Sequence, residues 1–150
     1  MPRLILLDSG PLGLVTNPRN SEETRECAAW LRSTLAAGVR VMVPEIADYE
    51  VRRELIRAGR RKGLARLDQL VAQLGLLVIT SAVWKRSAEL WASARRAGMP
   101  TAADAALDGD VILAALVHIS AEAGHESTVA TTNLGHLGRF VDARHWRDLG

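Results

Sequence analysis

Short apolar segments alternate with longer segments of helical periodicity along this chain, and this alternation constrains the fold more than any other feature. Each apolar run ends at polar or turn residues, a pattern typical of buried strands. Strands separated by helices indicate a mostly parallel sheet with helices on both faces, so we predict an α/β fold with about four to five strands. The strands are expected at residues 3–8, 39–43, 76–80 and 127–132, with a fifth within 140–146, and the helices at 20–38, 44–59, 63–74, 81–97 and from about 110 onward.

The composition is that of an ordinary globular protein. The chain has 150 residues, of which 48% are hydrophobic and 24% charged, and is expected to form a single domain over 1–150. Its formal net charge of +2 does not by itself indicate a nucleic-acid partner. Cys27 is the one cysteine, so no disulfide framework is expected. A chain without disulfides suits a reducing compartment, so we expect a cytoplasmic location. The apolar run ending at Asp8 is too short for a signal peptide, and no membrane partner is expected.

Polar side chains follow two of the expected strands at the point where each strand ends. Asp8 ends the first strand, and Asn133 directly follows the fourth in the sequence "VATTN". Ligands of parallel sheets bind outside the carboxyl ends of the strands, which puts both residues at the edge where a site is expected. Each also has a structural alternative: Asp8 could serve a turn or cap the next element, and Asn133 could form a turn in "NLG".

The helix after the second strand carries two glutamates within its apolar arc, Glu50 and Glu54. A carboxylate on a buried face is costly unless a positive charge compensates it. A salt bridge to Arg53 or Arg57 is the structural alternative, and it suits Glu54 best. Glu50 lies nearer the start of the helix and therefore nearer the edge of Asp8, so we select Glu50 as the candidate site residue.

Two aspartates stand before a helix that is apolar almost all round, in the stretch "ALDGDVILAALV" over 106–117. Asp108 is expected to cap this helix, and Asp110 to lie in its first turn, where the helix dipole favours an anion. A helix this apolar must be central, so Asp110 is expected to lie against the sheet.

Three carboxylates and one amide are thus expected at a single sheet edge. Crowded carboxylates repel one another unless a cation neutralises them, and oxygen ligands suit Mg²⁺ or Mn²⁺. The four histidines lack the paired spacing of a zinc site. The sequence therefore predicts a magnesium or manganese site formed by Asp8, Glu50 and Asp110, with Asn133 beside it.

A basic stretch, "RRELIRAGRRKGLAR" over 52–66, follows within and after the Glu50 helix. Such clusters neutralise phosphates, although a solvated helix face has the same composition. Aromatic residues make up only 4% of the chain, so few bases could stack on side chains. The candidate RNA-binding residues are Arg53, Arg57, Arg60, Arg61 and Lys62.

At these positions the chain resembles the PIN-domain ribonucleases, in particular the VapC-type toxins of toxin–antitoxin modules. The resemblance rests on "LLDSGPLG", "VPEIADYEVRREL", "LDGDVILAA" and "VATTN" and covers nearly the whole chain. The family's first aspartate falls on Asp8, its helical glutamate on Glu50, and the aspartate of its D-x-x-x-A-A helix on Asp110. Its fourth polar position, often aspartate, falls on Asn133 here. Asp104 and Asp108 also precede the helix and are alternatives to Asp110.

The resemblance implies a Mg²⁺- or Mn²⁺-dependent endoribonuclease that cleaves single-stranded or structured RNA with metal-activated water. Asp8, Glu50 and Asp110 would hold the metal, and Asn133 would bind it directly or through water. The resemblance also implies a homodimer and a cognate antitoxin that reaches into the acidic pocket. A PIN-like module that binds RNA or protein without cleaving it is the alternative.

Overall fold

The computed structural model describes residues 3–98, 104–135 and 137–150, with the backbone alone for 104–106. Its centre is a sheet of five strands in the order β3-β2-β1-β4-β5, and each neighbouring pair is parallel. This arrangement confirms the predicted α/β fold and includes the expected fifth strand. The strands are β1 (Leu4–Leu7), β2 (Val41–Pro44), β3 (Leu76–Leu77), β4 (Ser127–Thr131) and β5 (Ala143–His145).

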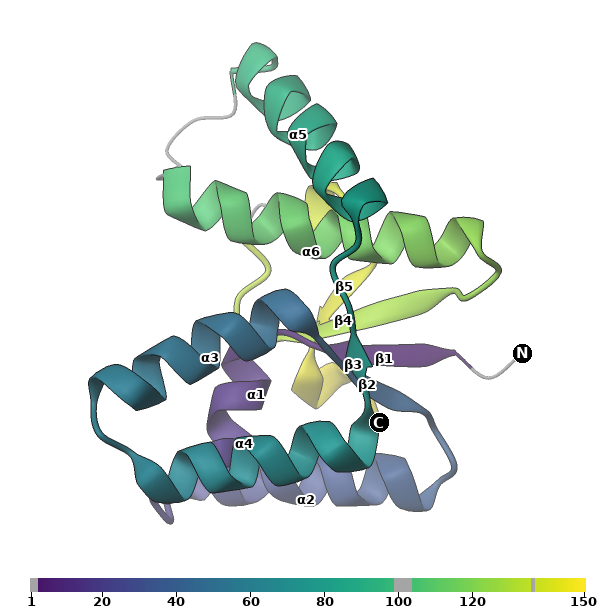
Figure 1. Ribbon diagram of the computed structural model, residues 1–150. Coiled ribbons are helices and arrows are strands. Elements are labelled where there is room, and N and C mark those ends of the chain that lie inside the picture. Colours follow the sequence, from purple (N-terminus) through teal and green to yellow (C-terminus); the bar gives the residue numbers. More distant parts are fainter. Residues whose placement is uncertain (1–2, 99–103, 136) are drawn as a thin grey trace.

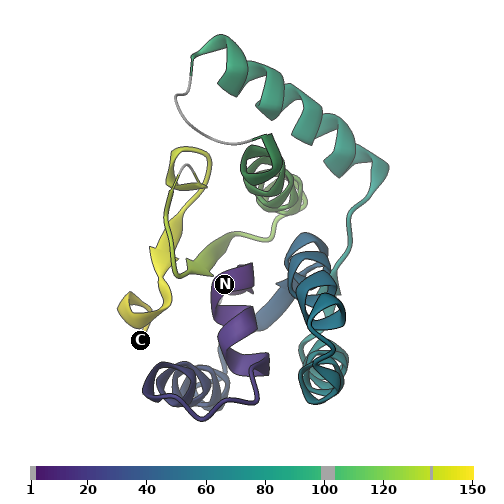
Figure 2. The same ribbon diagram turned by 90° about the vertical axis from the view of Figure 1, so that its left-hand side faces the viewer.

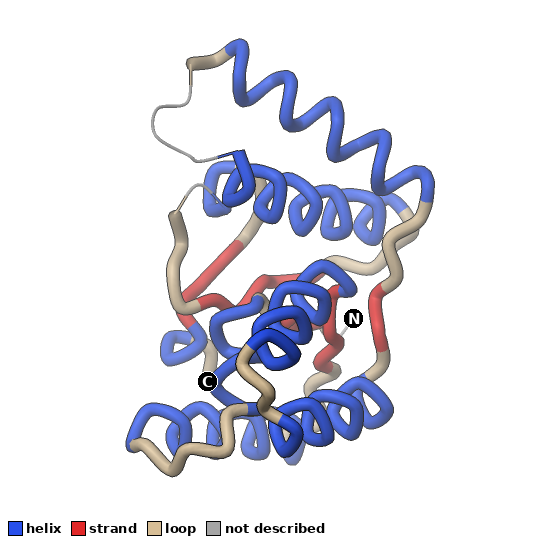
Figure 3. Tube along the Cα trace, turned by 60° about the vertical axis from the view of Figure 1, so that its left-hand side comes forward, coloured by secondary structure: helices blue, strands red, loops and turns tan. Residues whose placement is uncertain are grey.

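Helices cover both faces of the sheet. The helices α1 to α4 lie on one side, and α5 and α6 on the other, with α5 packed along the outside of α6 (Figures 1, 2 and 3). No helix in the described ranges is long and apolar enough to cross a membrane. The helices are α1 (Ser9–Thr16), α2 (Glu22–Ala36), α3 (Glu45–Arg57), α4 (Arg61–Leu74), α5 (Ser81–Arg96) and α6 (Asp104–Glu122), with short 3-10 turns η1 (Leu137–Arg139) and η2 (Trp146–Asp148).

The first strand divides its side chains between two hydrophobic cores. Ile5 and Leu7 pack among α1 to α4, whereas Leu4 and Leu6 pack among α5 and α6. Successive side chains of a strand point to opposite faces, so a strand buried on both sides is continuously apolar. The run "LILL" therefore fixes β1 at the centre of the molecule, and Asp8 follows at its carboxyl end.

The first helix, α1, was not expected, because "DSGPLG" has the composition of a turn. The side chain of Asp8 accepts a hydrogen bond from the Ser9 N–H and caps the helix. Pro11 lies in the first turn, where its missing N–H removes no helical hydrogen bond. Pro11 and Leu12 are buried, so tertiary packing outweighs the local preference for a turn.

The expected start of the central helix was wrong. Helix α6 begins at Asp104, so Asp108 lies within the helix rather than at its cap, and Asp110 lies beyond the first turn. The segment 104–109, which was expected to be a loop, is helical. Leu107 explains the extension, because it is buried against Ala94 of α5 and Val111 of α6. Gly109, which was expected to lie in the loop before the helix, therefore lies within α6.

Candidate active site

The sheet has a topological switch point between β1 and β4. The order β3-β2-β1-β4-β5 means that the connections leave β1 and β4 in opposite directions along the sheet. A crevice forms outside the carboxyl ends of the two strands at such a point, and it is where open α/β sheets bind ligands. Leu7 pairs with Ala130, so Asp8 and Thr131 follow directly at this crevice.

Asp8 is held there by two hydrogen bonds. Its Oδ1 accepts from the backbone N–H of Ser9 at 2.8 Å, and its Oδ2 accepts from the hydroxyl of Thr131 at 2.8 Å. Burial raises the pKa of Asp8 above its ordinary value, and these two bonds only partly oppose that effect. The prediction that Asp8 could cap the next element is therefore confirmed, since its carboxylate caps α1. The same carboxylate also lies at the switch point of the sheet.

Thr131 was not recognised from the sequence. Its side chain is 1% exposed, donates to Asp8 and accepts from the backbone N–H of Asn133 at 3.1 Å. The sequence feature that could have identified Thr131 is a hydroxyl side chain at the last position of a buried strand. The neighbouring strand β1 ends one residue before the carboxylate of Asp8, which therefore lies beside Thr131. A buried hydroxyl needs a partner, and that partner could have been sought at Asp8.

Glu50 comes to the same crevice from α3. The side chain is half-buried and lies against α6, where a Cβ added at Gly109 would stand 3.1 Å from its Oε2. Burial raises the pKa of Glu50, and the charges of Asp8 and Asp110 raise it further, against the lowering effect of Arg53. Asp8 and Asp110 thus both repel Glu50, and we call the group of these three carboxylates the acidic crevice.

The alternatives to Asp110 lie elsewhere or outside the described side chains. Asp108 is exposed and lines a hollow between α5 and α6 with Trp84 and Trp91, away from Glu50. The side chain of Asp104 lies outside the described residues. Among the aspartates of this helix with described side chains, Asp110 is therefore the one that shares the crevice.

Asn133 is exposed and closes a turn. Its Oδ1 accepts a hydrogen bond from the N–H of Gly135 at 3.1 Å, as an asparagine in an Asx-type turn does. The alternative given for Asn133 in the sequence analysis, a turn in "NLG", is therefore confirmed. Its Oδ1 has a second lone pair, so a role beside the acidic crevice stays a prediction.

The donor set of the acidic crevice fits a hard divalent cation in kind. Asp8, Glu50 and Asp110 offer oxygen atoms alone, which suits Mg²⁺ or Mn²⁺, and the absent Cβ of Gly109 leaves space beside the Glu50 carboxylate. Within the described residues, however, no three acidic, histidine or cysteine side chains stand close enough together to hold one ion. The carboxylates are near neighbours whose side chains would have to draw together around a cation.

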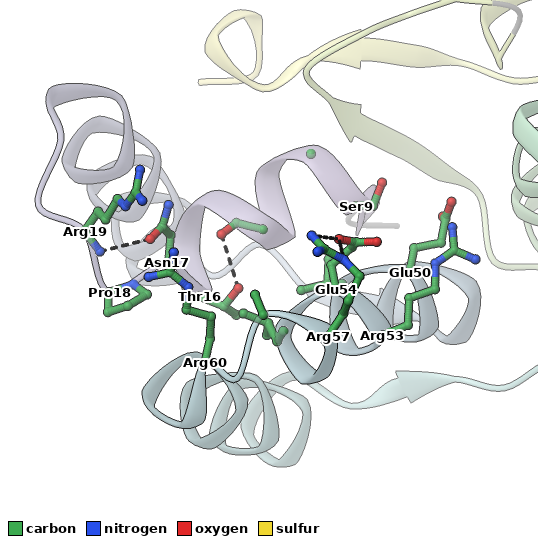
Figure 4. Close-up of a pocket in the computed structure, with 15 residues that line it drawn as sticks. Ser9, Thr16, Asn17, Pro18, Arg19, Glu50, Arg53, Glu54, Arg57 and Arg60 are labelled. Atoms are coloured by element: carbon green, nitrogen blue, oxygen red, sulfur yellow. Dashed lines mark hydrogen bonds and ion pairs between the residues drawn. The ribbon is translucent and has the colours of Figure 1, made fainter.

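A groove leads away from the acidic crevice between α1 and α3, with a volume of about 610 Å³. Figure 4 shows Ser9 and Glu50 at one end and Asn17, Pro18 and Arg19 at the other. We call it the α1–α3 groove. Three of the predicted RNA-binding residues line it, namely Arg53, Arg57 and Arg60, whereas Arg61 and Lys62 are exposed at the start of α4 and do not.

The charges of this groove differ in their partners. Arg57 pairs with Glu54 at 2.8 Å, which confirms the salt-bridge alternative for Glu54. Glu54 is exposed, so its placement on a buried arc was wrong. The guanidinium of Arg53 stands over the ring of Tyr49, 5.1 Å from its centroid. Arg19, which the sequence did not single out, adds a further exposed guanidinium.

No protein-family model matches this chain, and no curated protein is significantly similar to it in sequence. The structure superimposes on VapBC2 from Rickettsia felis bound to a DNA fragment from its promoter, with a TM-score of 0.68, 16% identity, and 95% of this chain and 98% of that chain covered. The chain has a PIN-like fold.

Two further solved structures agree with this fold. FitAcB from Neisseria gonorrhoeae gives a TM-score of 0.66 at 24% identity and covers 97% of this chain and 99% of that chain. VapBC-1 from nontypeable Haemophilus influenzae gives 0.66 at 11% identity, with coverage of 96% and 98%. The PIN-like fold of this chain is thus shared along its whole length with proteins that have diverged widely in sequence.

Proposed function

We propose that this protein is a metal-dependent endoribonuclease of the VapC type, the toxin of a toxin–antitoxin module. The convergence of Asp8, Glu50 and Asp110 at the switch point carries the proposal, because carboxylate oxygens gathered at the carboxyl ends of parallel strands are the ligands that Mg²⁺ or Mn²⁺ takes. The PIN-like fold and the VapBC structures that share it support the same function. The groove lined by arginines beside the crevice supports a polyanionic substrate.

The three carboxylates would hold Mg²⁺ or Mn²⁺. When bound, the cation lowers the pKa of a coordinated water and neutralises charge that develops on the phosphate. Thr131 and the Ser9 N–H keep both oxygens of Asp8 in fixed positions. Glu50 comes from a separate helix and its pKa is raised, so a cation would favour its charged form. Asn133 would bind a water through the free lone pair of its Oδ1.

The antitoxin would act at the same crevice. Solved VapBC complexes support a cognate protein partner for this chain. An arginine from that partner would compensate the carboxylates as a cation does, since a guanidinium binds carboxylates with two parallel hydrogen bonds. Antitoxin and metal should therefore compete. We also expect a homodimer, as VapC-type relatives form.

Cleavage of RNA by two matched variants tests the proposal. Asp8→Asn and Asp142→Asn each neutralise an aspartate that accepts a hydrogen bond from a threonine of β4. Asp8 lies at the carboxyl end of β4, whereas Asp142 lies near its amino end, away from the acidic crevice. Wild-type protein and Asp142→Asn should cleave RNA in Mg²⁺ or Mn²⁺ but not in EDTA, and Asp8→Asn should not cleave. Equal cleavage by Asp8→Asn, or cleavage that persists in EDTA, would contradict the proposal.

A module that binds RNA without cutting it is the second candidate. Two observations favour it: Asn133 stands where a fourth carboxylate is common, and the described carboxylates do not form a closed ligand shell. This candidate predicts RNA binding with no metal-dependent cleavage across a pool of random RNA sequences. Titration with Mn²⁺ separates the two further, because the nuclease should bind it and lose that binding in Asp110→Ala.

A further inference from the structure

A second groove lies on the other side of α1, between α1 and α2. Its described lining includes four arginines and no carboxylate. Leu14, Val15 and Ala28 give it an apolar floor. We call it the α1–α2 groove, and its arginines are Arg19, Arg25, Arg32 and Arg66, all of them exposed.

The two grooves meet at the end of α1. Asn17, Pro18 and Arg19 line both of them, and in Figure 4 these residues mark the end of the α1–α3 groove that lies away from Glu50. Arg66 of α4 donates to the carbonyl oxygen of Asn17 at 3.0 Å and so anchors the junction. The grooves are therefore neighbouring parts of one surface that bends around the C-terminal end of α1.

Most arginines along this surface are not in an ion pair, although the charge of Arg53 acts on Glu50 and Glu54. In the described part of the chain, Arg57 is the groove arginine with a carboxylate ion-pair partner. Arg25 and Arg66 each donate to a backbone carbonyl oxygen, at 2.7 and 3.0 Å, which leaves the charge uncompensated. A surface with an excess of guanidinium groups binds a chain of phosphates, because it releases the counterions that the phosphates had condensed.

We infer that the two grooves form one binding path for single-stranded RNA, which starts at the acidic crevice, passes Arg53 and Arg60, turns at Arg19 and ends in the α1–α2 groove. The inference rests on the proposed nuclease function. The turn around α1 favours a single strand, because a stiff duplex, with a persistence length of about 150 base pairs for DNA, must spend free energy to bend in this way. The substrate is therefore a flexible strand that extends several nucleotides beyond the cleaved phosphate.

An acidic peptide would also suit the arginines of the α1–α2 groove. Nothing would then tie that groove to the α1–α3 groove, which ends at carboxylates that could hold a metal ion beside a phosphodiester but have no role toward an acidic peptide. An RNA strand that is cleaved at the acidic crevice would contact both grooves and their junction. RNA therefore explains the arginines of both grooves, whereas an acidic peptide explains those of one groove.

Binding of fluorescein-labelled oligouridylates in EDTA tests the path without cleavage. The oligonucleotides have about four and about twelve nucleotides, which brackets the usual footprint of single-strand binding proteins. The variant Arg25→Gln/Arg32→Gln removes two charges at the far end of the path. The matched control, Arg40→Gln/Lys85→Gln, removes two exposed charges, one before β2 and the other on α5.

The path variant should lose much of the affinity gained between the short and the long oligonucleotide. The slope of log affinity against log salt should fall by about 1.4 for the long one, since each phosphate contact on a single strand contributes about 0.7. Between 50 and 200 mM salt this corresponds to about a sevenfold smaller loss of affinity. The control should bind the long RNA with the wild-type slope.

Wild-type binding of the long RNA by the path variant, or an equal loss in the control, would overturn the inference. A polyglutamate peptide bound by wild-type protein but not by the path variant, with RNA binding unchanged, would assign the groove to a protein partner and also overturn it. Because the assay contains no metal, its outcome is separate from that of the cleavage assay. A protein that binds along the path but never cleaves would retain the path and lose the nuclease function.

Discussion

The two ends of strand β4 hold two aspartates in the same way, and the surroundings give them opposite properties. At the carboxyl end, the hydroxyl of Thr131 donates to Asp8 at 2.8 Å. At the amino end, the hydroxyl of Thr128 donates to Asp142 at 3.0 Å. The local hydrogen bond is the same, so it cannot explain why one carboxylate belongs to a candidate active site and the other does not.

The neighbouring charges make the difference. Burial tends to raise the pKa of Asp142, but hydrogen bonds from Thr128 and Arg144 and the charge of Arg3 hold it below its ordinary value. At the other end of β4, burial raises the pKa of Asp8 with no arginine to oppose it among the causes of the shift, and the charge of Asp8 in turn helps to raise the pKa of Glu50. A carboxylate among arginines stabilises the fold, whereas carboxylates gathered together cost stability and indicate a functional role.

The largest expected effect is the loss of cleavage in Glu50→Gln. Removing one of three charges that would hold the cation should slow cleavage on the order of a hundredfold or more, as loss of a preorganised electrostatic group does. The control is Glu126→Gln, an exposed glutamate just before the amino end of β4. Rates of RNA cleavage in Mn²⁺ measure the difference, and similar rates for the two variants would break the distinction between the two ends.

The next largest effect should come from the two threonines. Thr131→Val leaves Asp8 without its hydroxyl donor and should reduce cleavage about 10- to 100-fold, which is typical for groups that orient a metal ligand. Thr128→Val makes the same change at Asp142 and should leave the cleavage rate within about twofold. Thr131→Ser should restore most of the rate, because it restores the hydroxyl. If Thr131→Ser is as slow as Thr131→Val, the methyl group matters rather than the hydrogen bond.

The stability effects of the aspartates should have opposite signs. At pH 7 in EDTA, Asp8→Asn should raise the melting temperature, because a carboxylate with a raised pKa disfavours the folded state when charged. Asp142→Asn should lower it, because a carboxylate with a lowered pKa stabilises the folded state when charged. A change on the order of 1 kcal/mol corresponds to about 2–4 °C for a chain of this length. Salt should shrink the effect at Asp142, since its side chain is 33% exposed.

The same two variants should converge with wild type at low pH. The stability that Asp142 contributes is present above its unfolded-state pKa and is lost as the pH falls through its folded-state pKa. The cost at Asp8 is complete above its raised folded-state pKa and disappears as the pH falls below the unfolded-state value of 3.8. Thermal unfolding curves across acidic and neutral pH measure both. Shifts of the same sign at pH 7 would refute the contrast.

The smallest expected effect is that of Gly109→Ala. The added Cβ would stand 3.1 Å from Oε2 of Glu50, so that carboxylate must move by a few tenths of an ångström. A shift of this size should slow cleavage about threefold, given that misplacement by 1 Å can cost about a hundredfold. The control is Gly138→Ala, where an added Cβ meets nothing within 4 Å. Equal rates for both variants would show that Glu50 has freedom to move.

The proximity of Asp8, Glu50 and Asp110 could be predicted from the sequence, although the reason for Asp110 failed because α6 begins at Asp104. A buried strand that ends in a carboxylate defines the edge, and Glu50 was selected because it lies near that end of its helix. Helical periodicity alone did not suffice, because it also placed the exposed Glu54 on the buried arc. Helix α1 could not be predicted, because Gly10 and Pro11 favour a turn locally and the burial of Leu12 decides otherwise. Arg19 was missed for the same reason: without α1, it has no groove to line. Thr131 was missed because its role depends on the register between β1 and β4.

Asp8 has two duties, and together they restrict which amino acids natural variation can leave at this position. Its side chain caps α1, the helix that walls both grooves, and it also belongs to the acidic crevice. Asparagine, serine and threonine can cap a helix but bring no charge to a cation, whereas glutamate brings the charge on a longer side chain that is not among the favoured caps. Among the common residues, aspartate alone meets both demands. A substitution here would therefore be rare in active homologues, and any chain that carries one should have lost either the wall of its groove or its cation.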